Sequence, residues 1–565
     1  MKKRIIVFVL FIFSVFFVSS QEVLKSAEED YYDFLSLEGF TERPSLIYRT
    51  LSDSDWEIKD NETHIWNEKN LGTTFTLWQP KNPGDNFFAK GLKQGLFLRL
   101  YGPEWYNSYN TAAPYGQNDG ALWQGKGYNT SFSTGLRLEG YGFELTFKPQ
   151  ISFSQNLAFE IMASNYDSEY GYFWGYGKNK GADAPQRFGN EAFYTFDWGD
   201  SEIRYSWHNF TVGFGNQSIW LGPAQINPML HSNNAATYTK FDIGLRRTQI
   251  VLPWLKWYLG DIESRLWVGK LTESEYFDNN DTNNHNQYNG FSISYAPSFL
   301  DGLILGFNKI CLNKWDNKFW QYVNPFYVGN TLGSIGEDTK ASLSADWTFE
   351  KSALNIYAEL GLDDFLSQGL KLYEYARYPF HTLTYTVGLK KAVKISESKG
   401  LSGLISFEWN NTEMSQDFQM WHPYNFGFHH QITQGYTNKG QWIGSGLGYG
   451  GNSQFLSFTL YSKHGYDKLF IGRNNPDNSY LYSKCVDGTS STELQYKWFT
   501  AYKANFFVGV EDLWFITKDF SIKSSFTYNM IINPGYNPGL SANGANREYN
   551  YWHNFCFGLS LKYQI

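Results

Sequence analysis

The chain has 565 residues and a net charge of −8, which argues against nucleic acid as a partner. Its three cysteines, Cys311, Cys485 and Cys556, are an odd number at wide spacing, so they indicate neither a disulfide framework nor a metal site. Aromatic residues make up 19% and charged residues only 18%, and the mean hydropathy is −0.45. This balance is typical of a membrane β-barrel with a wet lumen and Trp/Tyr girdles; a secreted β-sandwich or propeller is the alternative.

Residues 1–20 have the pattern of a secretory signal peptide. The basic residues Lys2–Arg4 precede an apolar run over 5–18, and Val18 and Ser20 supply small residues before a cleavage site at Gln21. A membrane anchor is the alternative, but the run is too short to span a bilayer. We therefore expect a cleaved signal peptide and export from the cytoplasm.

Residues 21–90 are predicted to form a short periplasmic segment with one or two helices, beneath a barrel. The pattern over Ala27–Leu35 indicates a helix that ends near Gly39. Pro44 then allows a second short helix to begin.

Residues 91–565 show the period-two alternation of strands with one apolar and one polar face. Examples are 131–139, followed by a turn at Gly140–Gly142 and a partner strand over 143–148, and the pair 341–350 and 354–360. The last stretch, Phe555–Ile565, is apolar at every odd position. At about 3.3 Å per residue and a tilt of about 40°, it covers the apolar band of an outer membrane, about 25 Å. Outer-membrane barrels typically close on such a strand.

The connections between these strands alternate between short turns and long polar segments, such as 279–289 and 410–424. This asymmetry is expected of short periplasmic turns and long external loops. At roughly 26 residues per strand and connection, the chain from residue 92 onward forms about 16 to 20 strands. The predicted fold class is all-β, a transmembrane antiparallel β-barrel that encloses a lumen, with a small helical periplasmic element.

Aromatic and polar side chains alternate in a predicted loop over 102–119, which is rich in glycine and asparagine. Aromatic rings stack on the apolar face of a sugar, while carboxylates and amides bind its hydroxyl groups. A membrane girdle would use the same aromatic residues, so that interpretation stays open. The candidate polysaccharide-binding residues are Glu104, Trp105, Tyr106, Tyr109, Tyr115, Asp119 and Trp123.

Three other motifs favour structural roles. His429 and His430 are adjacent on a predicted strand, so they point to opposite faces and cannot bind one metal together. Asp363 and Asp364 follow a strand and could bind a cation, but a solvated loop is the favoured interpretation. The glycine-rich run 444–448 lacks the strand-to-helix context of a phosphate loop or a nucleophile elbow.

Five blocks, in order along the chain, resemble the Wzi family of capsule assembly proteins. They are residues 28–56, 118–127, 214–223 with 230–235, 355–364, and 424–452. The family's proteins are outer-membrane barrels that hold capsular polysaccharide at the cell surface. The resemblance thus implies an 18-stranded barrel and polysaccharide binding.

The sequence therefore predicts a non-enzymatic barrel in the outer membrane of a diderm bacterium. We expect it to bind capsular or extracellular polysaccharide and to attach or organise it at the cell surface. The alternatives are a diffusion porin or other channel and, less favoured, an outer-membrane hydrolase. Expected partners are polysaccharide, outer-membrane lipid such as lipopolysaccharide, and the barrel assembly machinery during insertion; we expect a monomer, no cofactor and no bound metal.

Overall fold

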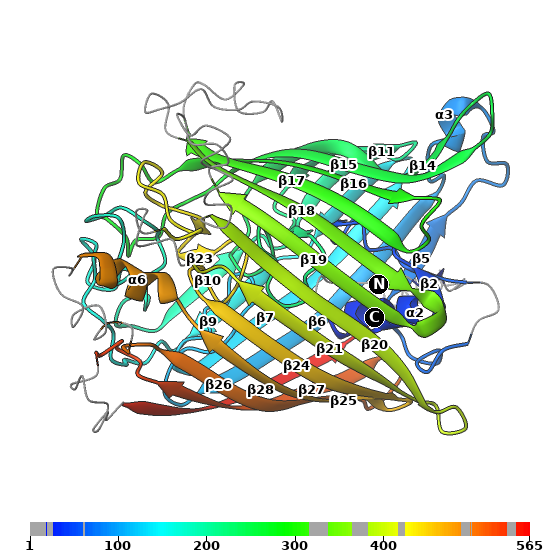
Figure 1. Cartoon of the computed structure of the whole chain (residues 1–565). Coiled ribbons are helices and arrows are strands. Elements are labelled where there is room, and N and C mark those ends of the chain that lie inside the picture. Colours follow the sequence, from blue (N-terminus) through cyan, green and yellow to red (C-terminus); the bar gives the residue numbers. More distant parts are fainter. Residues whose placement is uncertain are drawn as a thin grey trace, which may run out of the picture.

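The computed structural model describes residues 18–19, 26–59, 63–315, 337–363, 382–415, 424–487, 498, 500–538 and 550–565. Within these residues, 18 antiparallel strands form a closed barrel (Figure 1). They are β6 (Leu96–Asn110), β7 (Gly127–Gly140), β8 (Phe143–Phe147) continued by β9 (Gln150–Ser154), β10 (Phe193–Asp197) continued by β11 (Glu202–Trp207), β12 (Phe210–Gly215), β14 (Lys240–Val251), β15 (Tyr258–Lys270), β16 (Asn286–Pro297), β17 (Leu303–Lys314), β18 (Glu337–Phe349), β19 (Leu354–Asp363), β20 (Leu383–Ser396), β21 (Leu401–Asn411), β24 (Asn452–Ser462), β25 (Gly465–Asn475), β26 (Ala504–Phe515), β27 (Phe520–Ile532) and β28 (Tyr551–Tyr563).

The barrel closes where β28 pairs with the second half of β6, from Cys556 opposite Asn110 to Lys562 opposite Glu104. The first half of β6 pairs with β5 (Thr73–Trp78) instead. The remaining elements are β1 (Val18–Ser19), β2 (Thr41–Glu42), β3 (Tyr48–Arg49), β4 (Glu57–Ile58), β13 (Trp220–Leu221), β22 (Thr437–Asn438), β23 (Gln441–Trp442), the helices α2 (Ala27–Leu37), α3 (Phe87–Lys90) and α6 (Asn478–Asp487), and a 3-10 turn at Glu350–Ser352. Among the described residues, no helix is long and apolar enough to cross a membrane.

The period-two pattern of the sequence corresponds to the two faces of the wall. In β28, Phe555, Phe557 and Leu559 are 41–48% exposed on the outside, whereas Asn554 and Ser560 are buried inside. The strands predicted around 131–139, 143–148, 341–350 and 354–360 are confirmed as β7, β8, β18 and β19. The outer surface is thus a band of apolar side chains, and polar side chains face the interior.

Short turns and long connections lie at opposite ends of the barrel, as predicted. Residues 141–142, 208–209 and 463–464 are tight turns at one end, whereas 155–192 and 412–451 connect strands at the other. In Figure 1, α2 lies at the end with the short turns, on the right, and α6 lies at the end with the long loops.

Residues 26–59 and 63–72, here called the plug, lie inside the barrel at its short-turn end. In α2, Ser26 caps the first turn by accepting a hydrogen bond from the Glu29 amide (3.1 Å), and the chain turns away at Gly39, whose φ is +83°. The apolar face of α2 packs with Tyr461, Tyr466 and Leu513 of the wall. The predicted helix ending near Gly39 is confirmed. The predicted position beneath the barrel is wrong, because the wall encloses this apolar face.

The second helix predicted after Pro44 does not form. The chain there runs through bends into β3, which pairs with β13 inside the barrel. A helix does occur later in the predicted segment, but it is the four-residue α3 at Phe87–Lys90. Tertiary hydrogen bonds compete with helix formation here, because the backbone amides of Leu46 and Ile47 donate to the Glu263 carboxylate of β15 (2.7 and 3.3 Å).

Buried ion pairs join the plug to the wall. Asp33 lies between Lys390 of β20 (2.5 Å) and Arg43 (2.7 Å), and Arg43 also pairs with Asp346 of β18 (2.7 Å). Burial alone would raise the pKa of Asp33, but the two cations outweigh it and hold this pKa well below its usual range. The helix is therefore fixed by charge as well as by apolar packing.

A second ion-pair cluster joins the plug to neighbouring strands. Asp53 pairs with Arg265 of β15 (2.8 Å) and Arg246 of β14 (2.6 Å). At the edge of the plug, Glu28 pairs with Lys562 of β28 (2.8 Å). These contacts attach the plug to both sides of the barrel interior.

Loops from the other end fill much of the remaining lumen. Residues 219–238 and 424–449 pack against Trp267, Tyr288 and Ile310 on the inner face of β15, β16 and β17. Two predictions change here. His429 lies outside the named strands, in an isolated antiparallel bridge with Gly181, and its Nδ1 accepts hydrogen bonds from the amides of Gln431 and Ile432 (3.2 and 2.9 Å).

Asp363 also has a different environment from the one predicted. It pairs with Lys340 (2.8 Å) and accepts a hydrogen bond from the Tyr424 hydroxyl (2.8 Å), all buried inside the barrel. The solvated-loop interpretation is therefore wrong for Asp363, while Asp364 lies outside the described residues. A charge at a strand end was predicted to meet water, but loop 424–449 covers it.

Candidate functional site

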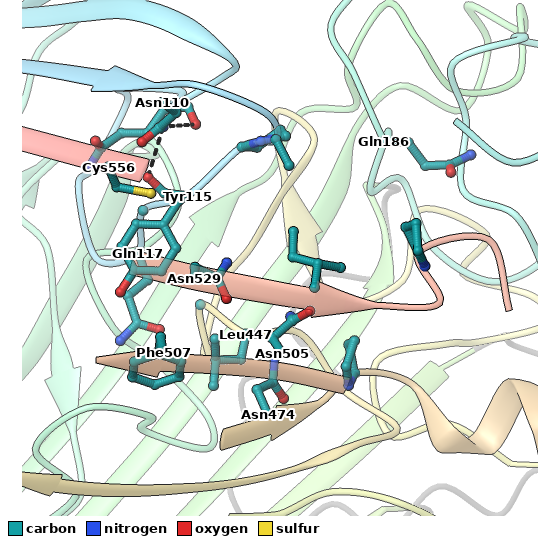
Figure 2. Close-up of a pocket in the computed structure, with 18 of the residues that line it drawn as sticks. Asn110, Tyr115, Gln117, Gln186, Leu447, Asn474, Asn505, Phe507, Asn529 and Cys556 are labelled. Atoms are coloured by element: carbon teal, nitrogen blue, oxygen red, sulfur yellow. Dashed lines mark hydrogen bonds between the residues drawn. The ribbon is translucent and has the colours of Figure 1, made fainter. Parts of the chain in front are cut away.

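A cavity of about 800 Å³ lies inside the barrel near its long-loop end. Strands β24 to β28 and β6 form its wall. Residues from segments 113–124, 159–163, 172–173, 184–186, 226–234, 440–447 and 534–537 contribute to the rest of its lining. The close-up in Figure 2 shows the side chains of β26 and β27 pointing into this space. Its size suits a short segment of a larger molecule.

Three phenylalanines form an aromatic surface on the inner face of the wall, with ring planes inclined to one another by 25–57°. Phe455 of β24, Phe470 of β25 and Phe507 of β26 have ring centroids 5.7–6.4 Å apart. Their orientation follows from the strand period, because their neighbours Leu456, Leu469 and Phe506 are exposed on the outside. We call Phe455, Phe470 and Phe507 the aromatic floor.

Two glycines allow these rings to lie across the adjacent strand. A Cβ atom at Gly472 would lie 2.2 Å from the ring of Phe507, and one at Gly509 would lie 2.3 Å from the ring of Phe470. Any side chain at either position would displace the ring. The two glycines therefore leave the space that these rings occupy.

Amide side chains form the polar part of the site, here called the amide group: Gln117, Asn474, Asn505 and Asn529. Asn474 and Asn505 are direct partners in the pairing of β25 with β26, and Asn529 is the partner of Phe507 on β27. Figure 2 shows Asn474 and Asn505 next to each other. Within the described part of the chain, the side-chain oxygens of Gln117, Asn505 and Asn529 are buried without a hydrogen-bond donor.

Buried acceptors of this kind need a donor, because an unpaired buried polar group costs about 1–3 kcal/mol. Hydroxyl groups of a bound molecule can supply it. The aromatic floor meanwhile offers apolar ring faces beside these acceptors. Together the floor and the amide group match the two faces of a sugar ring.

The loop at 111–126 is held rigidly beside the site. Asn110 donates hydrogen bonds to the carbonyls of Tyr115, Gln124 and Gly125, each at 3.1 Å. Gln124 also accepts from the Tyr106 hydroxyl (3.1 Å) and donates to Asp119 (2.6 Å). Burial raises the pKa of Asp119 to about 6, against the opposing hydrogen bond from Gln124.

Asp477 joins the loops that cover the cavity. It accepts hydrogen bonds from the Tyr172 hydroxyl (2.8 Å), from the indole of Trp174, and from the Asn425 amide (3.3 Å). Burial raises the pKa of Asp477 to about 7, although these donors favour the ionised form. Three connections that are far apart in sequence are thus fastened at one carboxyl group.

The structure divides the seven predicted binding residues into two groups. Tyr106, Tyr115, Asp119 and Trp123 line the 800 Å³ cavity. Glu104 lines a second cavity of about 230 Å³, closer to the plug, which Tyr106 and Asp119 also border. Whether these residues contact polysaccharide stays a prediction.

The remaining two residues, Trp105 and Tyr109, are 48% and 43% exposed on the outside of the barrel. Placing Glu104, Trp105, Tyr106 and Tyr109 in a loop was wrong, because β6 continues to Asn110 and pairs there with β7 and β28. The outward position of Trp105 and Tyr109 favours the girdle interpretation.

Sequence reasoning missed the aromatic floor and most of the amide group. The period-two pattern places Phe455, Phe470 and Phe507 on the polar face of their strands, which is the available signal. A large aromatic residue on that face must be accommodated inside the lumen. Which glycines lie opposite these rings depends on strand register, which sequence alone does not give.

Among the described residues, no three His, Cys, Asp or Glu side chains gather as a metal site requires. The three cysteines are buried, and none of them forms a disulfide. The cavity's lining offers stacking surfaces and hydrogen bonds, which suit binding.

The family model described as capsule assembly protein Wzi matches residues 115–312. None of the curated proteins matches the sequence. Among solved structures, Wzi of Escherichia coli has a TM-score of 0.56 at 11% identity, and the match covers 97% of this chain and 100% of that chain. That protein is described as an outer membrane protein involved in group 1 capsule assembly and as a carbohydrate-binding β-barrel.

Porins are similar at a lower level. A porin of Rh. blastica has a TM-score of 0.31 at 11% identity, covering 82% of this chain and 100% of that chain. OprB of Pseudomonas putida has a TM-score of 0.34 at 10% identity, covering 82% and 94%. Neither score supports an argument about this chain. The predicted resemblance to the Wzi family is confirmed, over residues 115–312 by the family model and over nearly the whole chain by the shared fold.

Proposed function

We propose that this protein is an outer-membrane β-barrel without enzymatic activity that binds capsular or extracellular polysaccharide and attaches or organises it at the cell surface. The observation that carries this proposal is the 800 Å³ cavity at the long-loop end, where the aromatic floor lies beside buried amide oxygens that lack donors. A sugar ring supplies both the apolar face and the hydroxyl donors. The description of the Escherichia coli protein as carbohydrate-binding supports the same function.

The outward-facing apolar band supports a location in the outer membrane, with lipid or lipopolysaccharide around the wall. Export by a signal peptide cleaved before Gln21, insertion by the barrel assembly machinery and a monomeric state complete the proposal. N-terminal sequencing of the mature protein tests cleavage before Gln21. Its recovery in the detergent-soluble envelope fraction tests insertion into the membrane. Its mass in detergent tests the monomeric state.

A diffusion porin is the second candidate, and the interior contacts favour the binding function over it. The plug is fixed to the wall by ion pairs at Asp33, Asp53 and Glu28, and the long loops pack into the lumen from the other end. A barrel filled from both ends suits the retention of a ligand. Single-channel recording separates the two, since a porin should pass a steady current.

The aromatic floor gives a test with a matched control. Phe507→Ala removes one ring of the aromatic floor. Phe506→Ala removes a ring from the adjacent residue of the same strand, which faces outward and is 41% exposed. Loss of one buried ring contact is worth about 1–2 kcal/mol, so Phe507→Ala should weaken binding about five- to thirtyfold. Phe506→Ala should leave affinity within about threefold of the unmodified protein.

The assay measures binding of polysaccharide extracted from the producing strain to the purified barrel in detergent. Heat-modifiable migration on a gel confirms that each variant is folded. In cells, deletion of the gene should release polysaccharide into the medium. Equal affinities of the two variants, or unchanged retention after deletion, would contradict the proposal.

A further inference from the structure

Lys503 lies on the same inner face as the floor and the amide group. Lys503 directly precedes β26, at every second position with Asn505 and Phe507, and all three line the cavity. The ammonium group of Lys503 lies 5.7 Å from the centre of the Tyr536 ring. A cation is thus built into a site that otherwise offers amides and aromatic rings.

Within the described residues, Lys503 has neither a hydrogen bond nor an ion pair with a carboxylate. Asp477 exerts the main opposing charge on it, but that carboxyl group is engaged by Tyr172, Trp174 and Asn425. Burial lowers the pKa of Lys503 to about 8. The side chain therefore remains mostly protonated at neutral pH, and its charge is poorly compensated.

The other charged groups that line the cavity do not supply the missing partner. Asp119 is bonded to Gln124, and Glu511 accepts a hydrogen bond from Tyr466 (2.6 Å). Glu511 lies eight residues further along β26, roughly 26 Å from Lys503. Glu160 is exposed on its loop.

We propose that the glycan held on the aromatic floor is acidic and that Lys503 binds its anionic group. This inference rests on the proposed function and adds the class of ligand. An ammonium group on the same inner face as the aromatic floor suits a sugar that carries a carboxylate or a phosphate ester. A charge-assisted hydrogen bond in a partly dry site is stronger than the neutral contacts around it.

The test compares polysaccharide from the producing strain with two treated forms of it. In one, the carboxyl groups are reduced to alcohols; in the other, phosphate esters are removed with hydrogen fluoride. The purified protein should bind native material at least about tenfold more tightly than the form that has lost its acidic group. The treatment that weakens binding identifies which anion Lys503 binds.

Variants assign this preference to Lys503. Lys503→Met should lose the preference, and Lys503→Arg, which keeps the charge, should retain it within about threefold. Lys518→Met, in an exposed turn at the opposite end, is the control. Heat-modifiable migration again reports folding.

Two results would overturn the inference and leave the proposed function standing: equal binding of native and treated polysaccharide, or an unchanged preference in Lys503→Met. If the unmodified protein binds none of the three materials, the proposed function itself fails.

Discussion

The ion pair between Asp33 and Lys390 allows a quantitative test of how the plug is held. Lys390 is 2% exposed and forms an ion pair with Asp33 at 2.5 Å. Asp33→Asn keeps the size of the side chain but leaves the Lys390 ammonium buried without a counter-charge. Arg43 keeps its second partner, Asp346 (2.7 Å), so the loss is concentrated on Lys390.

Breaking a buried ion pair by removing one partner costs about 3–5 kcal/mol. Each 1.4 kcal/mol is a tenfold change, so the equilibrium between seated and displaced plug should shift by about two to four orders of magnitude. Asp33→Asn barrels should therefore show frequent channel openings in planar bilayers. Their plug should also become sensitive to protease.

Two variants make this interpretation specific. Glu38→Gln, at the end of the same helix, removes a carboxylate that accepts a long hydrogen bond from Ser402 (3.4 Å), so it should change little. Asp33→Asn combined with Lys390→Met removes the unpaired charge and should recover most of the closed state, because an apolar replacement of a buried pair is often tolerated. Unchanged conductance and protease resistance in Asp33→Asn would refute the reasoning.

Two further predictions concern the covering loops and the outer surface. The pKa of Asp477 is raised to about 7 in the folded loops, whereas an Asp carboxyl in the unfolded chain has a pKa of about 3.9. The folded loops therefore bind more protons than the unfolded chain, and their stability should fall as pH rises through 7. Amide hydrogen exchange around 172–174, corrected for the intrinsic rate, should thus increase between pH 5 and pH 8. Asp477→Asn should remove this pH dependence. A pH-independent exchange rate in the unmodified protein would contradict the prediction. Trp105→Ala with Tyr109→Ala should leave glycan affinity within about threefold but reduce insertion into lipid vesicles, since both rings face outward. Weakened glycan binding by a fully inserted double variant would show that the girdle interpretation is wrong.

The features that could be predicted from sequence are those that depend on neighbours along the chain. Alternation through Phe555–Ile565 and 131–139 is enough to indicate strands, because each residue's face follows from the period alone. The helix from Ala27 was equally readable, from its cap and the glycine at its end. Composition was a poorer guide, since the Gly/Asn-rich stretch after Gly102 continues as β6 to Asn110.

The features that could not be predicted depend on contacts across the barrel. Asp363 looked like a solvated loop residue because its partners Lys340 and Tyr424 are distant in sequence. The plug looked like an external element because Asp346 and Lys390, which bind it, lie on strands more than 300 residues away. The aromatic floor requires the pairing of β24, β25 and β26, which no local pattern specifies.

The interlocking of Phe470 with Gly509 and of Phe507 with Gly472 has a consequence for assembly. If β25 and β26 slipped by one residue as the barrel formed, side chains of the shifted strand would change faces and the rings would meet Cβ atoms instead of gaps. A misaligned barrel could still insert and resist heat, yet it would have no continuous floor. Sugar affinity would then report how faithfully these strands were aligned during insertion, a fidelity that migration on a gel does not detect.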